Sequence, residues 1–275
     1  MNILNRLLAY SPDIKQSWML FGIYILCLVV STAVTAIMRK TGIATPEWSW
    51  FFSGLLGFAI LARIVVHLGK DADHVPVKPP RQPLLLWLLL IPFTLSIGII
   101  VGPLTTWIPM PDLVKQMAEE VFQDNLPAFL RIAVLAPVCE EWLFRGIILK
   151  GLLIRNSPFK AIMWSSIIFG VFHLNPWQTV SAFFYGLAIG WIYLHTRSLR
   201  YCIFMHMANN AVMFFLTIGL FPDIPDDITL TDLAGGHYAY IVVIFVCALT
   251  MMWIKKTLIS SGVTADKKIR NCNGT

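Results

Sequence analysis

The chain has 275 residues, of which 57% are apolar and only 13% are charged. Soluble proteins carry about 25% charged residues, so this composition and a mean hydropathy of +0.71 exclude ordinary soluble domains and indicate a polytopic membrane protein. The net charge of +6 does not indicate nucleic-acid binding, because most Lys and Arg residues lie in short loops beside apolar segments, as membrane orientation requires.

Eight apolar segments follow one another along the chain. Most of them reach the ~20 residues that a helix needs to cross a bilayer. The sequence therefore predicts an all-α, polytopic membrane bundle of about eight transmembrane helices. The segments are 17–38, 49–68, 83–103, 127–154, 160–174, 178–195, 201–220 and 238–256.

The fifth segment, 160–174, is the shortest and stops at Asn175-Pro176. At 1.5 Å per residue it spans only ~22 Å, so it can end inside the bundle or pair with the sixth segment as a shallow hairpin. Gly186 and Gly190 in the sixth segment are four residues apart, which predicts close contact with a neighbouring helix.

The basic residues predict the orientation of the chain. With the N-terminus in the cytoplasm and alternating sides, fourteen Lys and Arg residues fall inside and three outside. The positive-inside rule then places both termini in the cytoplasm. We expect an integral, multi-pass protein, here of a bacterial cytoplasmic membrane, with the lipid bilayer as a partner and no nucleic-acid partner.

The sequence predicts four regions. Residues 1–126 hold the first three transmembrane helices and an outside loop, in which 111–122 can form an amphipathic surface helix. Residues 127–220 form the core, with helices four to seven. Residues 221–260 hold an outside loop and the last transmembrane helix, and 261–275 are expected to be a disordered cytoplasmic tail.

The fourth segment carries two carboxylates and a guanidinium at bilayer depth, where one charge costs at least ~2.5–3.5 kcal/mol. Glu141 and Arg145 are four residues apart, so on a helix they share a face and can neutralise each other. Glu140 lies about 100° around the helix and is free to face a cavity as a general base. The alternative is a purely structural buried ion network.

Two later segments add further polar groups. His173 closes the fifth segment, although a lone histidine at a helix end is more often an interfacial or core residue than a catalyst. His206 and Asn210 in the seventh segment share a face, so their N–H groups can stabilise an oxyanion. Alternatively they bond neighbouring helices together. Asn209 is expected to point away from that face.

These helices together supply a carboxylate, two imidazoles and an amide. This set suits an activated water rather than a covalent nucleophile, and no Ser or Cys has a convincing nucleophile setting in the sequence. A Glu/His/His set could also bind zinc, but the HExxH pattern is absent. We therefore expect no metal and no cofactor, with zinc as the alternative.

Three motifs on successive helices, in this order, resemble the CPBP family. They are Glu140-Glu141-xxx-Arg145, Phe169-xxx-His173 and His206-xxx-Asn210, within roughly residues 127–220. The family includes CAAX prenyl-protein endopeptidases and bacteriocin-processing and bacteriocin-immunity proteins. The resemblance implies an intramembrane glutamic endopeptidase whose substrate is a membrane-associated protein or peptide, including prenylated ones.

The resemblance also implies a role for each group. Glu140 with His173 would activate the attacking water, and His206 with Asn210 would stabilise the oxyanion. The ion pair in the fourth segment would support the site. Because alternating topology brings His173 near the outer side and His206 toward the cytoplasmic side, the site closes only if the fifth segment tilts or ends at mid-depth.

Two other functions are consistent with the same sequence. The first is a non-enzymatic membrane scaffold or bacteriocin-immunity protein on the same fold. The second is a transporter that uses buried carboxylates as a proton relay, for which the expected inverted repeats with matching Gly or Pro interruptions are not convincing in the sequence.

Overall fold

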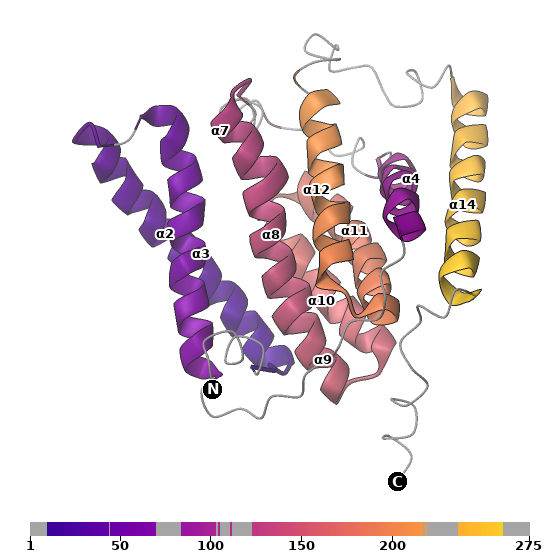
Figure 1. The fold of residues 1–275 in the computed structure, drawn as a ribbon, viewed down its shortest axis with the longest axis horizontal. Helices are drawn as coiled ribbons and strands as arrows, with labels where there is room; N and C mark the ends of the chain where they lie inside the picture. The colour runs from indigo at the N-terminus through magenta and orange to yellow at the C-terminus, as the bar shows by residue number, and fades with distance from the viewer. Residues whose placement is uncertain are drawn as a thin grey trace.

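The protein is a bundle of helices, and every element in the described part of the chain is helical (Figure 1). The computed structural model describes residues 10–43, 45–69, 84–102, 123–216 and 236–260, together with positions 104, 111 and 218. The predicted amphipathic helix, the loop after residue 221 and the C-terminal tail lie almost entirely outside these residues. The all-α prediction is confirmed.

Eight helical rods correspond to the eight predicted segments. The fourth is a continuous rod made of five consecutive elements. The elements are α2 (Ile14–Lys40), α3 (Pro46–Leu68), α4 (Leu84–Val101), α7 (Leu126–Phe129), η1 (Leu130–Leu135), α8 (Ala136–Glu141), η2 (Trp142–Leu149), α9 (Lys150–Arg155), α10 (Pro158–Phe172), α11 (Pro176–Thr196), α12 (Leu199–Phe215) and α14 (His237–Ser260).

The rods are arranged in three groups. In Figure 1, α2 and α3 pack together on one side, α4 and α14 pack together on the other, and the fourth rod stands between them with α10, α11 and α12. The first residue of α2 and the last residue of α14 lie at the same end of the bundle, as an even number of passes requires.

Polar caps fix where several helices begin. The Asp13 side chain accepts from the Gln16 backbone N–H at 2.7 Å, while the Gln16 side chain accepts from the Asp13 backbone N–H at 2.9 Å. At the starts of the fourth rod and of α11, the side chains of Asn125 and Asn175 accept from the backbone N–H three residues later, and each Asn is followed by a proline in the first turn. The cap at Asn175 therefore separates α10 from α11, where the sequence predicted the fifth segment to stop.

The fourth rod contains two stretches of wide, π-type turns, η1 and η2. Such turns pair residues five apart and often occur at functional sites. At the end of η1 the Ala136 N–H donates to the Arg131 carbonyl. Pro137 has no N–H, so the helix offers no donor in that register to the carbonyl of Ile132.

Helices α10 and α11 form a tight hairpin because glycines line their contact. A Cβ at Gly186 would lie 3.1 Å from the Ser166 Cβ, and one at Gly170 would lie 2.8 Å from the Thr179 carbonyl oxygen. A Cβ at Gly190 would meet an isoleucine methyl at 3.1 Å. The predicted close contact of Gly186 and Gly190 with a neighbouring helix is confirmed.

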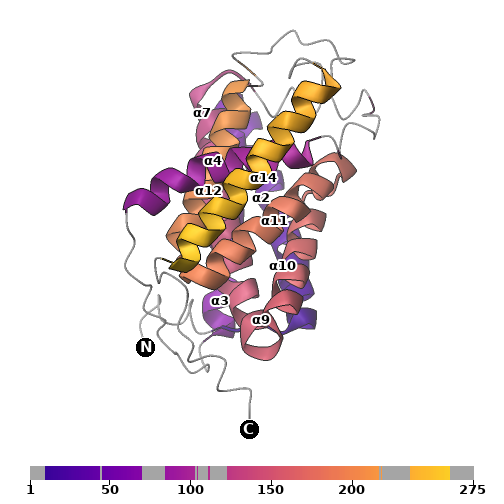
Figure 2. The same cartoon turned by 90° about the vertical axis from the view of Figure 1, so that its right-hand side faces the viewer.

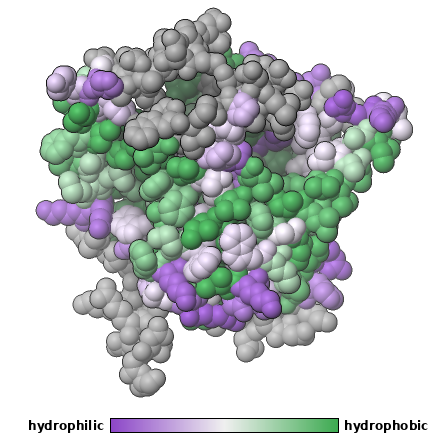
Figure 3. Space-filling model, turned by 180° about the vertical axis from the view of Figure 1, so that it is seen from behind, coloured by the Kyte–Doolittle hydropathy of each residue, from purple (hydrophilic) through white to green (hydrophobic). Residues whose placement is uncertain are grey.

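Four helices in the described part of the chain, α2, α3, α4 and α14, are long and apolar enough to cross a membrane. Helix α10 is apolar but shorter. Large apolar side chains such as Leu26, Leu88 and Phe245 are exposed on these long helices. Figure 3 shows the same character on one face, where apolar side chains form a broad band. The prediction of a helical membrane bundle is confirmed.

Candidate active site

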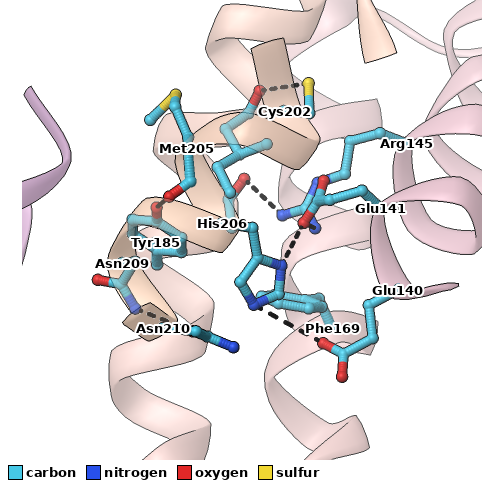
Figure 4. A network of polar contacts seen from close by, with 12 residues as sticks. Glu140, Glu141, Arg145, Phe169, Tyr185, Cys202, Met205, His206, Asn209 and Asn210 are labelled. Carbon is cyan, nitrogen blue, oxygen red and sulfur yellow. Dashed lines mark hydrogen bonds and ion pairs between the residues drawn. The ribbon is translucent and has the colours of Figure 1, made fainter. Parts of the chain in front are cut away.

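The buried charges lie at the centre of the fourth rod. The Arg145 Nη1 donates to Glu141 Oε1 at 2.7 Å, and both side chains are buried. The Arg145 Nη2 also donates to the Gly186 carbonyl at 3.4 Å, and the guanidinium lies 4.3 Å from the Phe169 ring centroid (Figure 4). These contacts compensate a cation that would otherwise be costly at this depth. The predicted ion pair is confirmed.

His206 connects the two glutamates. Its Nδ1 lies 2.8 Å from Glu141 Oε1, and its Nε2 lies 4.0 Å from Glu140 Oε2 (Figure 4). An ionised carboxylate can only accept, so Nδ1–H donates to Glu141 and Nε2 is turned toward Glu140. Glu141 therefore holds both Arg145 and His206, a second role that helical spacing alone did not predict.

Glu140 differs from its neighbour in its surroundings. Its side chain is 12% exposed, whereas that of Glu141 is fully buried. Glu140 Oε2 is buried without a hydrogen-bond donor from any described residue. Glu141 also has one such oxygen, but its other oxygen is bound to Arg145 and His206. Glu140 is the carboxylate that is available for chemistry.

His173 ends α10 and lies beside the same aromatic ring as His206. Its Nδ1 is 3.1 Å from the Phe169 carbonyl oxygen, which can only accept, so Nδ1 carries the proton and Nε2 is left as an acceptor. The Phe169 ring is edge-on to both imidazoles, with centroids 5.3 Å from His173 and 5.8 Å from His206. The structure therefore brings both histidines against one aromatic ring.

The predicted position of His173 near the outer side of the membrane stays a prediction, whereas its position relative to the other site residues follows from the bundle. Helix α10 starts beside the end of α9, and it stops after 15 residues. His173 directly follows α10, and its ring lies against the Phe169 ring that also contacts His206. The short helix therefore ends beside His206 inside the bundle, as closure of the site required.

Asn210 joins α12 to the fourth rod. Its Nδ2 donates to the Ile132 carbonyl at 2.9 Å, the group that lacks a partner in the π-type register before Pro137. Its Oδ1 accepts from the Asn209 Nδ2 at 3.2 Å, so the expectation that Asn209 points away is wrong. The bond from Asn210 to Ile132 matches the alternative in which the seventh segment uses its polar side chains to hold neighbouring helices together. An amide has two N–H donors, so a role toward an oxyanion stays a prediction.

Two further residues support the site and were missed by the sequence analysis. The Tyr185 hydroxyl donates to the carbonyl of Met205 at 2.7 Å, and its ring centroid lies 6.0 Å from that of His206. Thr94 of α4 lies 3.4 Å from the same hydroxyl. The available signal was a tyrosine within an apolar segment, because a buried tyrosine usually finds a hydrogen-bond partner.

Helix α2 closes the aromatic side of the site. The Tyr24 ring stacks on Phe172 with centroids 5.1 Å apart, and Phe172 packs against Phe144 at 5.4 Å. Phe144 in turn packs edge-on against Phe169 at 5.0 Å. This row of rings ties the N-terminal helices to the residues around the two imidazoles.

The zinc alternative finds no support in ligand geometry. In the part of the chain that the structure describes, no group of three or more His, Cys, Asp or Glu side chains is placed to hold a metal ion. The expectation of no metal and no cofactor stays a prediction, and a chelator test is described below.

Comparison with known proteins finds a family match within this core. Residues 122–212 match the family described as type II CAAX prenyl endopeptidase Rce1-like, which confirms the resemblance to the CPBP family. The match covers 91 of the 275 residues and contains all six predicted site residues. No curated protein and no solved structure matches the chain.

Proposed function

We propose that this chain, whose residues 122–212 form an Rce1-like domain of the CPBP family, is a glutamic-type intramembrane endopeptidase. Its substrate would be a membrane-associated protein or peptide that carries a prenyl group. The observation that supports the proposal most is the contrast between the two glutamates. Glu140 Oε2 has no donor among the described residues and faces His206, while Glu141 is bonded on one oxygen to two partners.

In the proposed reaction, Glu140 takes a proton from water and the oxygen of that water attacks the carbonyl carbon of the scissile peptide bond. The Nε2 of His173 is an acceptor and would orient the same water through its second hydrogen. When the C–N bond breaks, Glu140 passes its proton to the leaving amine. The products are one new carboxylic acid, which then loses its proton to the amine or to solvent, and one new amine, so no covalent enzyme intermediate is required.

The oxyanion of the tetrahedral intermediate needs hydrogen-bond donors aimed at it. We assign this role to the Nε2–H of His206, which would act as an imidazolium that carries a proton on each ring nitrogen, and to the second amide N–H of Asn210. Glu141 would act as a positioning residue, because it holds His206 through Nδ1. Arg145 would in turn hold Glu141 and balance its charge.

We also propose that both termini face the cytoplasm. The excess of Lys and Arg on that side supports this orientation. The start of α2 and the end of α14, which lie at the same end of the bundle in Figure 1, would then be cytoplasmic, and Glu140 would lie near the middle of the membrane.

Comparative proteomics of membrane peptides tests the function and names the substrate. Cells would carry either the wild type, Glu140→Gln, or the control Glu47→Gln, which changes an exposed glutamate at the start of α3. We expect uncut precursors to accumulate with Glu140→Gln alone. Identical peptide profiles for all three proteins, expressed at equal levels, would contradict an endopeptidase that uses Glu140.

A non-enzymatic scaffold or immunity protein is the second candidate. It is favoured by the bonds of Asn210 to Ile132 and of His206 to Glu141, which hold helices together without any chemistry. This function would survive Glu140→Gln, because that substitution leaves both bonds in place. A phenotype that persists in the Glu140→Gln variant would therefore favour the scaffold.

A further inference from the structure

An apolar groove lies on the surface between α4, α11 and α14, separate from the candidate active site. Its volume is about 540 Å³, and each of the three helices contributes four lining residues. Eleven of the twelve are apolar, and the remaining one is Lys255. None of the six predicted site residues lines this groove.

The groove exists because α14 and α11 both pack on α4 and leave space between them. The Tyr240 hydroxyl of α14 donates to the Ile99 carbonyl of α4 at 2.7 Å, and Tyr185 of α11 contacts Thr94 of α4 at 3.4 Å. Figure 2 shows α14 crossing in front of α4, with α11 beside them. The groove therefore lies on the outer face of the bundle that carries α14, the face seen in Figure 2.

The size of the groove fits one hydrocarbon chain. Its walls run from Phe184 to Trp191 and from Ala248 to Lys255, which is about 10 Å along each helix. The volume lies within the ~300–1,000 Å³ range of small-molecule sites, which are mostly apolar.

The charge of the groove is at one end. Lys255 lies one to two turns before Ser260, at the end of the bundle where Arg155 and Arg197 also lie, and Trp191 lines the groove near it. Lysine and tryptophan are typical of the interface between membrane and water, where basic residues between helices bind anionic headgroups. An apolar channel with a cation at its interfacial end matches an amphiphile with a negative head.

We propose that this groove binds an anionic phospholipid, with one acyl chain between α11 and α14 and the headgroup on Lys255. Phe93 and Phe184 line the groove, and the residues that follow them, Thr94 and Tyr185, contact each other on the inner side. The bound chain fills the space between α14 and the core. It therefore stabilises the attachment of α14 and the α4–α11 contact behind His206.

The headgroup is tested with the full chain purified in detergent. Phosphatidylglycerol or phosphatidylcholine is added, and bound lipid is counted by native mass spectrometry. We expect Lys255→Gln to weaken phosphatidylglycerol binding about fivefold, as expected for one lysine at an anionic surface. The control Lys256→Gln removes the same charge from an exposed position outside the groove lining and should change binding less than about twofold.

The acyl chain is tested by filling the groove. Ala248→Phe places a ring in the groove and should abolish retention of phosphatidylglycerol, whereas Leu249→Phe on the exposed side of α14 should retain it. Equal effects of Lys255→Gln and Lys256→Gln would overturn the proposal. Equal binding of both lipids, or full retention by folded Ala248→Phe, would overturn it too. The lysine variants alone decide the matter if Ala248→Phe does not fold.

Discussion

The peripheral helices and the Rce1-like core use the membrane in opposite ways. The four helices that are long and apolar enough to cross a bilayer, α2, α3, α4 and α14, all lie outside residues 122–212. They expose apolar side chains, and most of their residues are not buried inside the protein. The core instead turns carboxylates, imidazoles and a guanidinium inward.

The difference shows where polar groups can be kept at bilayer depth. An apolar side chain that faces lipid needs no partner, since lipid tails are as apolar as leucine. A buried charge needs a partner or it costs several kcal/mol. Arg145, Glu141 and His206 are paired in a row through Glu141 Oε1. Substitutions in the core should therefore be far more damaging than matched substitutions at the periphery.

The largest expected loss of stability follows Glu141→Ala. The substitution leaves Arg145 buried without its carboxylate and releases His206, so we expect unfolding free energy to fall by about 3–5 kcal/mol. Chemical denaturation in detergent micelles measures this change. The exposed Glu47→Ala is the peripheral control and should stay within about 0.5 kcal/mol. A Glu141→Ala variant as stable as the wild type would contradict the expectation that core substitutions cost more stability than peripheral ones.

His173→Gln should lower the rate of peptide cleavage by about 10²–10⁴, the contribution typical of a group that handles protons. The matched control is His195→Gln. The Nδ1 of His195 bonds the carbonyl four residues earlier at 2.8 Å, as that of His173 does, but His195 lies at the opposite end of a helix from the site. Cleavage of a prenylated peptide by purified protein gives both rates. Equal losses in the two variants would argue against a catalytic role for His173.

Gly186→Ala should destabilise the core by about 1–3 kcal/mol, because its Cβ would lie 3.1 Å from the Ser166 Cβ and push α10 from α11. Gly98→Ala on the peripheral α4 meets nothing within 4 Å and should instead gain up to about 1 kcal/mol of helix propensity. Thermal unfolding of both variants measures the difference. Shifts of the same sign and size would contradict the tight α10–α11 contact.

The smallest expected effect is that of a chelator. If Glu140 activates water without a metal, cleavage by the purified protein should keep its rate in the presence of EDTA. The assay includes zinc added back after chelation. Loss of cleavage with EDTA and its recovery with zinc would replace the proposed mechanism by the zinc alternative.

The sequence predicted the order of the helices and the central ion pair. Hydropathy is enough to locate the long peripheral helices, because a helix that faces lipid is recognised from its length and apolar composition alone. The four-residue spacing of Glu141 and Arg145 was enough to predict their contact, which the structure confirms at 2.7 Å. The cap at Asn175 likewise marked the end of the fifth segment.

The contacts between different helices could not be predicted, because they depend on how the helices pack and not on the spacing of residues along the sequence. The wide turns around Pro137 leave the carbonyl of Ile132 to Asn210, whereas an ideal helix would have used that carbonyl internally. The contact between His206 and Glu141 joins residues 65 apart and needs the position of α12. The position of His173 against the ring that also contacts His206 likewise depends on how α10 packs in the bundle.

The most direct test of the central claim compares cleavage and stability in one variant, Glu140→Gln, reconstituted in the same bilayer as the wild type. The substrate is a prenylated CAAX peptide, and the released C-terminal fragment is measured by mass spectrometry. We expect the rate to fall at least about 100-fold while the midpoint of thermal unfolding stays the same. Undiminished cleavage would contradict Glu140 as the base. A rate that falls only together with the unfolding midpoint would show that the carboxylate is structural.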